Sequence, residues 1–304
     1  MDRSSIYYRQ VQLLVSLIPL IAEEDCFALK GGTAINLFAR DLPRLSVDID
    51  LVYLPMDERT TALANITQAL GRISSFIKTT FADAGVVEVY RDKPDALRLV
   101  VSRGDVQVKV ELSPVLRGTV FEPEVRSVSE AVEDEFGYAE IAVLAMADLY
   151  AGKICAALDR QHPRDLFDVR WLLDHEGIND EIRKALLVYL ISHPRPIAEL
   201  IDPVFSDLET AYVGEFAQMT DVGVPLAALL ATREQLVGMV RSGFSKDDRE
   251  FLLSFKARNP RWELLDLPHV EQLPAVRWKM MNLEKMSVAK HQASYQKLQG
   301  LLGK

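Results

Sequence analysis

The fold is decided between residues 26 and 54, which read CFALKGGTAINLFARDLPRLSVDIDLVYL. The apolar run at residues 26–29 predicts a buried strand, and residues 34–40 predict a short helix. Gly31 and Gly32 stand between them, where a backbone without Cβ atoms can turn sharply and approach a phosphate closely. We therefore expect a strand, a glycine turn and a helix to follow one another directly.

The next apolar run alternates with acidic residues. Side chains in a strand change face at every residue, so Asp48 and Asp50 share one face while Val47, Ile49 and Leu51 occupy the other. The two aspartates interrupt an otherwise apolar run, which favours a functional face over a simply buried one.

Apolar spacing predicts a mixed α/β region through the first 130 residues. Besides the elements described above, two helices are expected at residues 4–24 and 57–78, and three strands at residues 86–90, 96–102 and 105–112. Arg103 and Gly104 form the expected hairpin turn between the last two strands. Glu111 lies on the polar face of the final strand, where it can join Asp48 and Asp50.

From residue 141 onward the apolar spacing becomes helical, with prolines as punctuation. We therefore expect an α+β protein with two domains. The first is a mixed-sheet domain at residues 1–130, and the second is a mainly helical domain at residues 131–304.

The glycine turn and the carboxylates together indicate phosphoryl chemistry. Backbone amides at a helix start can bind phosphate oxygens. Carboxylates can hold a pair of Mg²⁺ ions about 3.5–4 Å apart for an in-line displacement. Each motif alone has a plainer explanation, a structural turn or a solvated strand face. Their combination favours nucleotidyl transfer, with Asp48, Asp50 and Glu111 as candidate metal ligands.

The composition is that of a globular protein, with 304 residues, 49% hydrophobic and 26% charged, and a net charge of −9. Such a charge argues against attraction of nucleic acid to the whole surface. Residues 251–304 differ, since they hold nine basic residues against four acidic ones, and we expect them to help bind RNA. The nine are Lys256, Arg258, Arg261, Arg277, Lys279, Lys285, Lys290, Lys297 and Lys304.

Cys26 and Cys155 are too few and too far apart for a disulfide framework, which favours a reducing compartment. The apolar run at residues 11–22 resembles a signal peptide core, but polar residues interrupt it and no small-residue cleavage site follows. No stretch reaches the roughly 18 apolar residues of a membrane span. We therefore expect a cytoplasmic protein without a membrane partner. Its five histidines show no metal-ligand spacing and are expected on the surface or in helix caps.

Two blocks of sequence resemble a known family. The first contains Lys30-Gly31-Gly32-Thr33 and then Arg44-Leu45-Ser46-Val47-Asp48-Ile49-Asp50-Leu51. The second contains Asp148-Leu149-Tyr150-Ala151-Gly152-Lys153, Asp159-Arg160 and Arg164-Asp165-Leu166-Phe167-Asp168. Together they resemble the AbiEii-type toxins of bacterial type IV toxin–antitoxin systems, including the MenT-like enzymes of mycobacteria. These toxins belong to the DNA polymerase β-like nucleotidyltransferase superfamily.

The resemblance implies a polymerase β-like mixed sheet with flanking helices, followed by a helical domain that completes the active site. The implied catalytic positions are Asp48, Asp50, Lys153 and Asp168. The implied nucleotide-binding positions are Lys30, Gly31, Gly32, Thr33, Ser46 and Arg160, with Asp165 as a neighbour.

Several of these positions have structural alternatives. Lys153 offers a compact cation to triphosphate oxygens but can equally be a surface lysine. Asp168 can act as a base, or form an i,i+4 ion pair with Arg164. Ser46 can be a strand-entry serine. Much of the superfamily has an Asp where Glu111 stands, so Glu111 can be an exposed strand residue instead of a ligand.

The function implied by the resemblance is that of an Mg²⁺-dependent toxin, which moves a nucleoside monophosphate from an NTP to a hydroxyl and releases pyrophosphate. The implied acceptor is the 3′ end of tRNA, or another RNA, and extension of tRNA would block translation. A cognate antitoxin protein is the implied partner. Transfer to a small molecule or a protein hydroxyl remains open, as does a catalytically silent interaction protein that retains the fold.

Overall fold

The computed structural model describes residues 3–303, which fold into two compact units. Unit 1 contains Met1–Ala145 and Ala217–Gly223, and unit 2 contains Met146–Phe216 and Val224–Lys304. The first boundary therefore lies after Ala145, further along the chain than the change of sequence pattern predicts.

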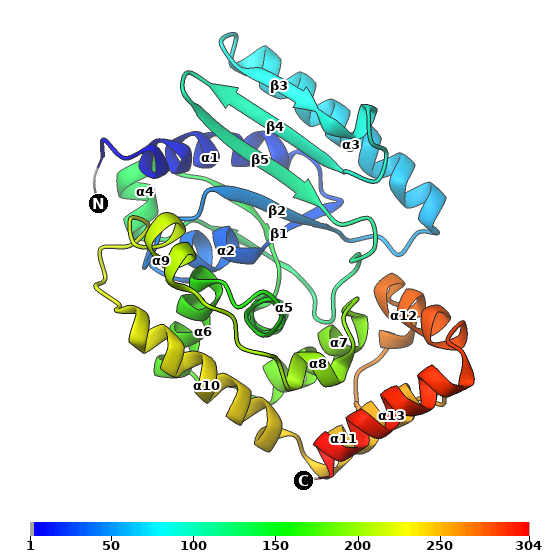
Figure 1. Ribbon diagram of the computed structural model, residues 1–304. Helices are drawn as coiled ribbons and strands as arrows, with labels where there is room; N and C mark the ends of the chain where they lie inside the picture. Colours follow the sequence, from blue (N-terminus) through cyan, green and yellow to red (C-terminus); the bar gives the residue numbers. More distant parts are fainter. Residues whose placement is uncertain (1–2, 304) are drawn as a thin grey trace. The chain divides into compact units, whose positions relative to one another are not determined.

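Unit 1 is built on a seven-stranded mixed sheet with the strand order β3-β4-β5-β2-β1-β7-β6 (Figure 1). Its strands are β1 (Phe27–Lys30), β2 (Asp48–Tyr53), β3 (Gly85–Glu88), β4 (Arg98–Arg103), β5 (Val106–Leu112), β6 (Glu124–Ser127) and β7 (Glu140–Val143), and a 3₁₀ turn, η2 (Val89–Arg91), follows β3. β2 pairs antiparallel with β1 and parallel with β5, and β1 pairs parallel with β7. The expected α+β class is confirmed, and the strand with alternating carboxylates lies at the centre of the sheet.

Two helices cover one face of this sheet (Figure 1). α1 (Ile6–Ala22) packs on β5 and β7, α3 (Arg59–Thr80) packs on β3 and β4, and the two helices contact each other. The strands turn alternate apolar side chains toward these helices, among them the fully buried Ile49, Leu99 and Val110. Burial of this surface stabilises the unit by roughly 25 cal/mol per Å². The polar side chains of the same strands therefore point to the opposite face.

A helical segment begins directly at the glycine turn. α2 (Gly31–Thr33) continues into a π-helical turn, η1 (Ala34–Ala39). The expected helix is therefore present but starts earlier than residue 34. π-Helical turns are rare and occur often at functional sites.

The sequence pattern does not predict β6 and β7, the last two strands at one side of the sheet. The helical region expected from residue 141 begins instead after β7, and a short helix, α4 (Glu130–Phe136), separates β6 from β7. β7 pairs with β1 through Val143 and Leu29. Each of the two strands has four residues, which is too few to show a period, and the partner of β7 is distant in sequence.

Within the described residues, the regular structure of unit 2 is helical. Its elements are α5 (Met146–Asp159), α6 (Pro163–His175), α7 (Asp180–Ser192), α8 (Ile197–Ile201), α9 (Glu209–Glu215), α10 (Leu226–Gly243), α11 (Lys246–Lys256), η3 (Trp262–Leu264), η4 (Val270–Gln272), α12 (Pro274–Glu284) and α13 (Val288–Leu302). α5 packs on α6 and α7 at the start of the unit. The expected helical second half is confirmed. None of the helices in residues 3–303 is long and apolar enough to span a bilayer.

Candidate active site

The carboxylates of β2 lie in a row of charged residues that crosses four strands. Asp50 is in register with Lys30 on β1 and with Glu111 on β5, and Glu111 is in register with Arg98 on β4. Residues directly opposite each other on neighbouring strands point to the same face. Two acidic groups are therefore flanked by a cation at each end, and Asp48 joins them two residues before Asp50.

Gly31 lies directly beside the Asp50 carboxylate. Its φ angle is +75°, in the left-handed region that favours glycine. A Cβ atom at this position would stand 2.6 Å from Asp50 Oδ2 and 3.3 Å from Asp50 Cβ. Both the backbone conformation and the available space require glycine, so the turn and the carboxylate form one packed unit.

The second glycine makes room for a different pair of side chains. A Cβ atom on Gly32 would stand 2.7 Å from Arg44 Nη2 and 2.9 Å from Ser46 Oγ. Ser46 Oγ lies 3.0 Å from Thr33 Oγ1, which donates a 2.5 Å hydrogen bond to the backbone carbonyl of Asp48. These buried contacts hold the loop before β2 against the turn, and a nucleotide-binding role for Thr33 and Ser46 stays a prediction.

A distant segment of the chain also anchors this loop within unit 1. Ala217–Gly223 lies between α9 and α10 in the sequence but belongs to unit 1. The Leu45 amide donates to the Met219 carbonyl at 2.7 Å, and Thr220 Oγ1 donates to the Pro43 carbonyl at 2.8 Å. No local sequence pattern predicts these hydrogen bonds, because they join residues that are far apart in the chain.

Glu111 is ion-paired across the strands, with its Oε1 2.8 Å from Arg98 Nε. Residues 3–303 contain no group of three or more His, Cys, Asp or Glu arranged to hold a metal ion. Arg98 already engages the third carboxylate of the expected set, so a metal-ligand role for Glu111 stays a prediction. Asp48 and Asp50 remain, and two carboxylates combined with substrate phosphates are a donor set that suits Mg²⁺.

Unit 2 brings together the residues of the second sequence block. The Lys153 ammonium on α5 lies 2.9 Å from Asp165 Oδ1 and 3.0 Å from Asp168 Oδ2 on α6. Arg160 donates to both oxygens of Asp165, at 2.6 and 3.0 Å. Lys153, Asp165 and Asp168 are 7%, 0% and 1% exposed, so the surface-lysine alternative is wrong. Asp165, which the sequence resemblance treats as a neighbour, is the centre of this cluster.

Asp165 is ionised in spite of its burial. Burial by itself raises the pKa of a carboxyl, but the positive charges of Lys153 and Arg160 outweigh this effect and hold the pKa of Asp165 well below its ordinary value. Loss of Lys153, the buried partner, would leave this buried charge with only the more exposed Arg160, which is strongly destabilising.

Packing between α5 and α7 explains other residues of the same block. A Cβ atom on Gly152 would stand 3.2 Å from Tyr189 Cε1, so a small residue lets the two helices approach. Tyr189 donates a 3.1 Å hydrogen bond to Asp148 Oδ1. Burial, together with the charge of Asp148, raises the pKa of Tyr189 well above its ordinary value, which keeps its hydroxyl a donor. Gly152 and Asp148 therefore help to orient the helix that carries Lys153.

Asp168 contacts Lys153 in place of the expected i,i+4 pair with Arg164. Arg164 Nη2 lies 3.7 Å from Glu215 instead. His162 precedes α6, and its Nδ1 accepts a 3.1 Å hydrogen bond from the Arg164 amide. This is the capping role expected for a histidine of this chain.

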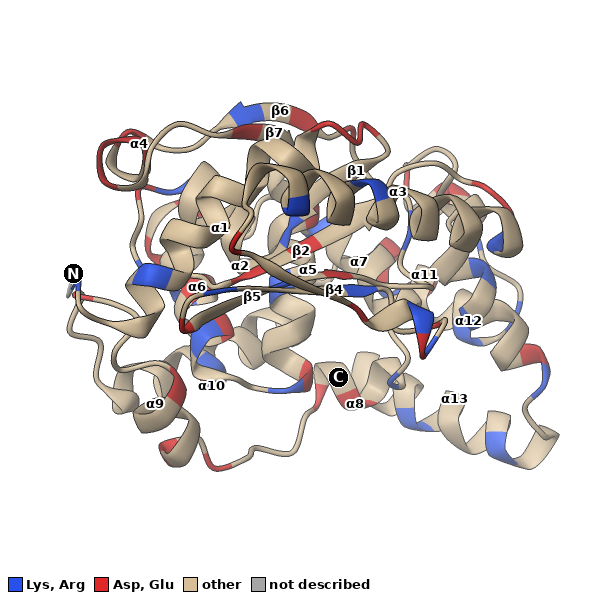
Figure 2. Ribbon diagram, turned by 90° about the horizontal axis from the view of Figure 1, so that it is seen from above, with Lys and Arg blue, Asp and Glu red and all other residues tan. Residues whose placement is uncertain are grey.

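Basic residues of the C-terminal segment contribute to the fold of unit 2 as well as to its surface. Lys279 donates to the carbonyls of His193, Pro194 and Arg195, at 2.5, 3.2 and 2.8 Å. Lys304 lies outside the described residues. Figure 2 shows basic residues on α13, and the sequence of this helix contains no acidic residue. Lys279 therefore also has a role in the fold, and RNA binding by the nine basic residues stays a prediction.

A glycine turn packed against paired carboxylates on the central strand of a mixed sheet defines an enzyme of phosphoryl or nucleotidyl transfer. The chain belongs to the nucleotidyl transferase AbiEii toxin family of type IV toxin–antitoxin systems, whose family model matches residues 12–281. It is therefore a nucleotidyltransferase of the toxin class, as its two sequence blocks indicate.

Solved structures resemble the chain along most of its length. MenT4, a nucleotidyltransferase toxin from Mycobacterium tuberculosis, matches with a TM-score of 0.62 at 15% identity, over 93% of this chain and 95% of that chain. A putative nucleotidyltransferase from H. pylori matches with a TM-score of 0.45 at 18% identity, over 80% of this chain and 99% of that chain. Among curated proteins, none matches the chain. The likeness to MenT4 supports the fold.

Proposed function

We propose that the protein uses Mg²⁺ to transfer a nucleoside monophosphate from an NTP to the 3′-terminal hydroxyl of tRNA, and so stops translation in the cytoplasm. Its family supports the reaction class and a cognate antitoxin that opposes it. The observation that carries the proposal is the packing of Gly31 against Asp50. In this contact, a turn that can bind phosphate lies against a carboxylate that can bind a metal ion.

The reaction forms one bond and breaks one. The acceptor oxygen bonds to the α-phosphorus, the bond from that phosphorus to the bridging oxygen breaks, and pyrophosphate leaves with the electron pair. The hydroxyl proton passes to a carboxylate of the site or to water. Asp48 and Asp50 would hold Mg²⁺, which when bound neutralises charge on the phosphate oxygens.

Lys153 and Asp168 are proposed to serve the same reaction in different ways. Lys153 is the phosphate-binding cation, since a compact ammonium suits phosphate oxygens. Asp168 contacts this ammonium at 3.0 Å and is 1% exposed, so it is better suited to position Lys153 than to take a proton from the acceptor.

The test is incubation of the protein with each labelled NTP in turn and with tRNA, other RNA, protein and metabolite fractions of one lysate. We expect label on tRNA that requires Mg²⁺ and is lost in Asp50→Asn. Label on the protein or metabolite fraction would overturn the proposed acceptor in favour of another hydroxyl. Absence of label from every fraction would overturn the proposed reaction in favour of an interaction protein.

A further inference from the structure

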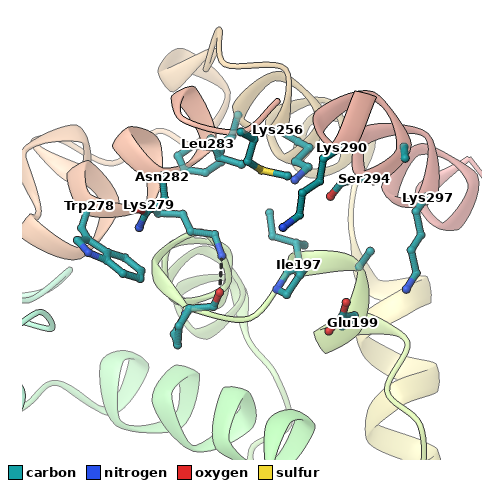
Figure 3. A pocket seen from close by; sticks show the side chains of 16 residues that line it. Ile197, Glu199, Lys256, Trp278, Lys279, Asn282, Leu283, Lys290, Ser294 and Lys297 are labelled. Carbon is teal, nitrogen blue, oxygen red and sulfur yellow. Dashed lines mark hydrogen bonds between the residues drawn. The ribbon is translucent and has the colours of Figure 1, made fainter. Parts of the chain in front are cut away.

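A pocket of about 650 Å³ lies within unit 2, lined by residues of α8, α11, α12 and α13 and the segment before α8 (Figure 3). This volume is in the range of small-molecule binding sites. Its lining includes four lysines and a single acidic residue, namely Lys256, Lys279, Lys290 and Lys297 with Glu199. A chain with a net charge of −9 therefore concentrates positive charge around one cavity.

Lys256 is the most unusual member of this lining. It is 7% exposed, and within residues 3–303 its ammonium has neither a hydrogen bond nor an ion pair. Burial lowers the pKa of Lys256, and the charge of Arg258 lowers it further. The ammonium is not one of the fully buried polar atoms that lack a partner, so it reaches the surface of the pocket, where the unpaired charge of a largely buried side chain destabilises the fold. A ligand that supplied the counter-charge would remove this penalty.

Other ammonium groups reinforce the positive field. Figure 3 shows Lys256 and Lys290 directed toward the same part of the pocket from different helices, while Glu199 lies on the side of Lys297. The three donors of Lys279 are engaged by backbone carbonyls, so it contributes charge alone. Burial and the charge of Lys256 lower the pKa of Lys279 to about 8. Cations that repel one another here favour a ligand with more than one negative charge.

The remaining lining indicates the body of that ligand. Apolar side chains, among them Ile197, Phe255 and Leu283, form part of the walls, and the Trp278 ring adds a planar surface. A lone phosphate would leave these walls uncovered. A planar ring, in contrast, can stack on tryptophan, as nucleic acid bases do on aromatic side chains.

We propose that this pocket binds a nucleotide unit, with its phosphate at Lys256 and Lys290 and its base at Trp278. A free nucleotide and a nucleotide within an RNA strand share this chemistry. The site is separate from the proposed reaction, since it uses none of the residues assigned to that reaction. If this pocket does not bind a nucleotide, the proposal of nucleotidyl transfer at Asp48 and Asp50 is unaffected.

Titration calorimetry on the full chain tests the proposal. EDTA is present throughout, so that metal-dependent binding at Asp48 and Asp50 is suppressed. The probes are inorganic phosphate, nucleoside monophosphates and a short oligoribonucleotide. We expect a nucleotide probe to bind at least about tenfold more tightly than phosphate, because only a nucleotide covers the apolar walls.

Variants show where that binding occurs. Lys256→Met and Lys290→Ala should each weaken it about tenfold or more, because each removes a charge-assisted contact. Lys246→Ala is the matched control, since it removes one exposed charge from α11 outside the lining, and it should change affinity less than about twofold. Lys256→Met should also raise the thermal unfolding midpoint, whereas loss of a structural lysine would lower it.

The affinities of the probes for wild type and for Lys256→Met identify the ligand. Binding of mononucleotides that depends on Lys256 identifies a free nucleotide as a sufficient ligand, and Lys256-dependent binding of the oligoribonucleotide alone identifies RNA. Equal affinities of wild type and Lys256→Met for both probes would overturn the proposal. Phosphate that binds as tightly as the nucleotides would overturn the role of Trp278 and the base.

Discussion

The carboxylate of Asp50 rests so closely against Gly31 that a Cβ atom on Gly31 would stand 2.6 Å from Asp50 Oδ2. Asp50 lies on strand β2, and Gly31 lies in the turn after β1. A helical segment and a loop separate the two residues in the sequence. A side chain at Gly31 would have to displace an oxygen that we assign to the metal ion. Gly31 is therefore required by the site as well as by its backbone conformation.

Gly31→Ala is expected to abolish transfer, whereas Gly104→Ala is not. Their φ angles are +75° and +61°, so both changes destabilise the backbone by about 1 kcal/mol. Only at Gly31 does the new methyl group meet Asp50, since nothing lies within 4 Å of a Cβ atom on Gly104. The measurement is turnover per folded molecule, with the folded fraction taken from urea unfolding. Similar turnover in the two variants would contradict the assigned contact.

Asp48→Asn and Asp50→Asn should each lower transfer at least about 100-fold, because each removes a ligand charge from the metal site. The free energy of unfolding should change little, since the two carboxylates repel each other on one strand face. Transfer and Mg²⁺-dependent NTP binding are measured together. Asp105→Asn, an exposed change at the hairpin, is the control. Full activity in Asp50→Asn would refute the metal assignment.

Glu111→Gln should lower transfer by less than about tenfold, because its carboxylate is engaged by Arg98 at 2.8 Å and such partly exposed pairs contribute only about 0–1 kcal/mol. Arg98→Gln should have an effect of similar size. Both are compared with Asp50→Asn in the same transfer assay. A loss in Glu111→Gln as large as that in Asp50→Asn would restore Glu111 as a third metal ligand.

Lys153→Met should lower the free energy of unfolding by about 3–5 kcal/mol, because it leaves Asp165 and Asp168 buried without their shared cation. Arg160→Gln should cost only about 1 kcal/mol, since the Arg160 side chain is 60% exposed. Lys153→Arg should restore transfer poorly, because a planar guanidinium does not reproduce a compact ammonium between two carboxylates. Urea unfolding and the transfer assay check these outcomes, and wild-type transfer by Lys153→Arg would exclude a phosphate-binding role.

Acid should remove the contribution of Asp165 to stability. Its pKa in the folded protein lies below the ordinary value of 3.8, so the unfolded chain binds the proton more readily. The stabilisation is complete above the unfolded-state pKa and is lost as the pH falls through the folded-state value. Asp165→Asn should therefore be less stable at pH 7 yet lose less stability than wild type below about pH 4. Urea unfolding over this pH range gives the comparison, and identical losses would contradict it.

Features that depend on local periodicity can be predicted from the sequence. Asp48 and Asp50 share a face because a strand alternates, and the turn at Gly31 lies between a strand and a helical segment because both neighbours have local apolar patterns. The resemblance of the second block to a family singles out Lys153 and Asp168 as candidate catalytic residues, a role that stays a prediction. Strand β7, which lies between β1 and β6, is not predicted by the sequence, since its four residues show no period and its partner β1 is distant in the chain.

Which distant groups come into contact depends on the tertiary structure. Leu45 is anchored by Met219, Asp165 becomes the centre of a buried ion cluster, and Lys256 and Lys290 line one pocket. These relationships depend on how helices and loops turn their faces toward one another after chain reversals. Such orientations are set by burial of apolar surface over a whole unit, and no local window of the chain encodes them.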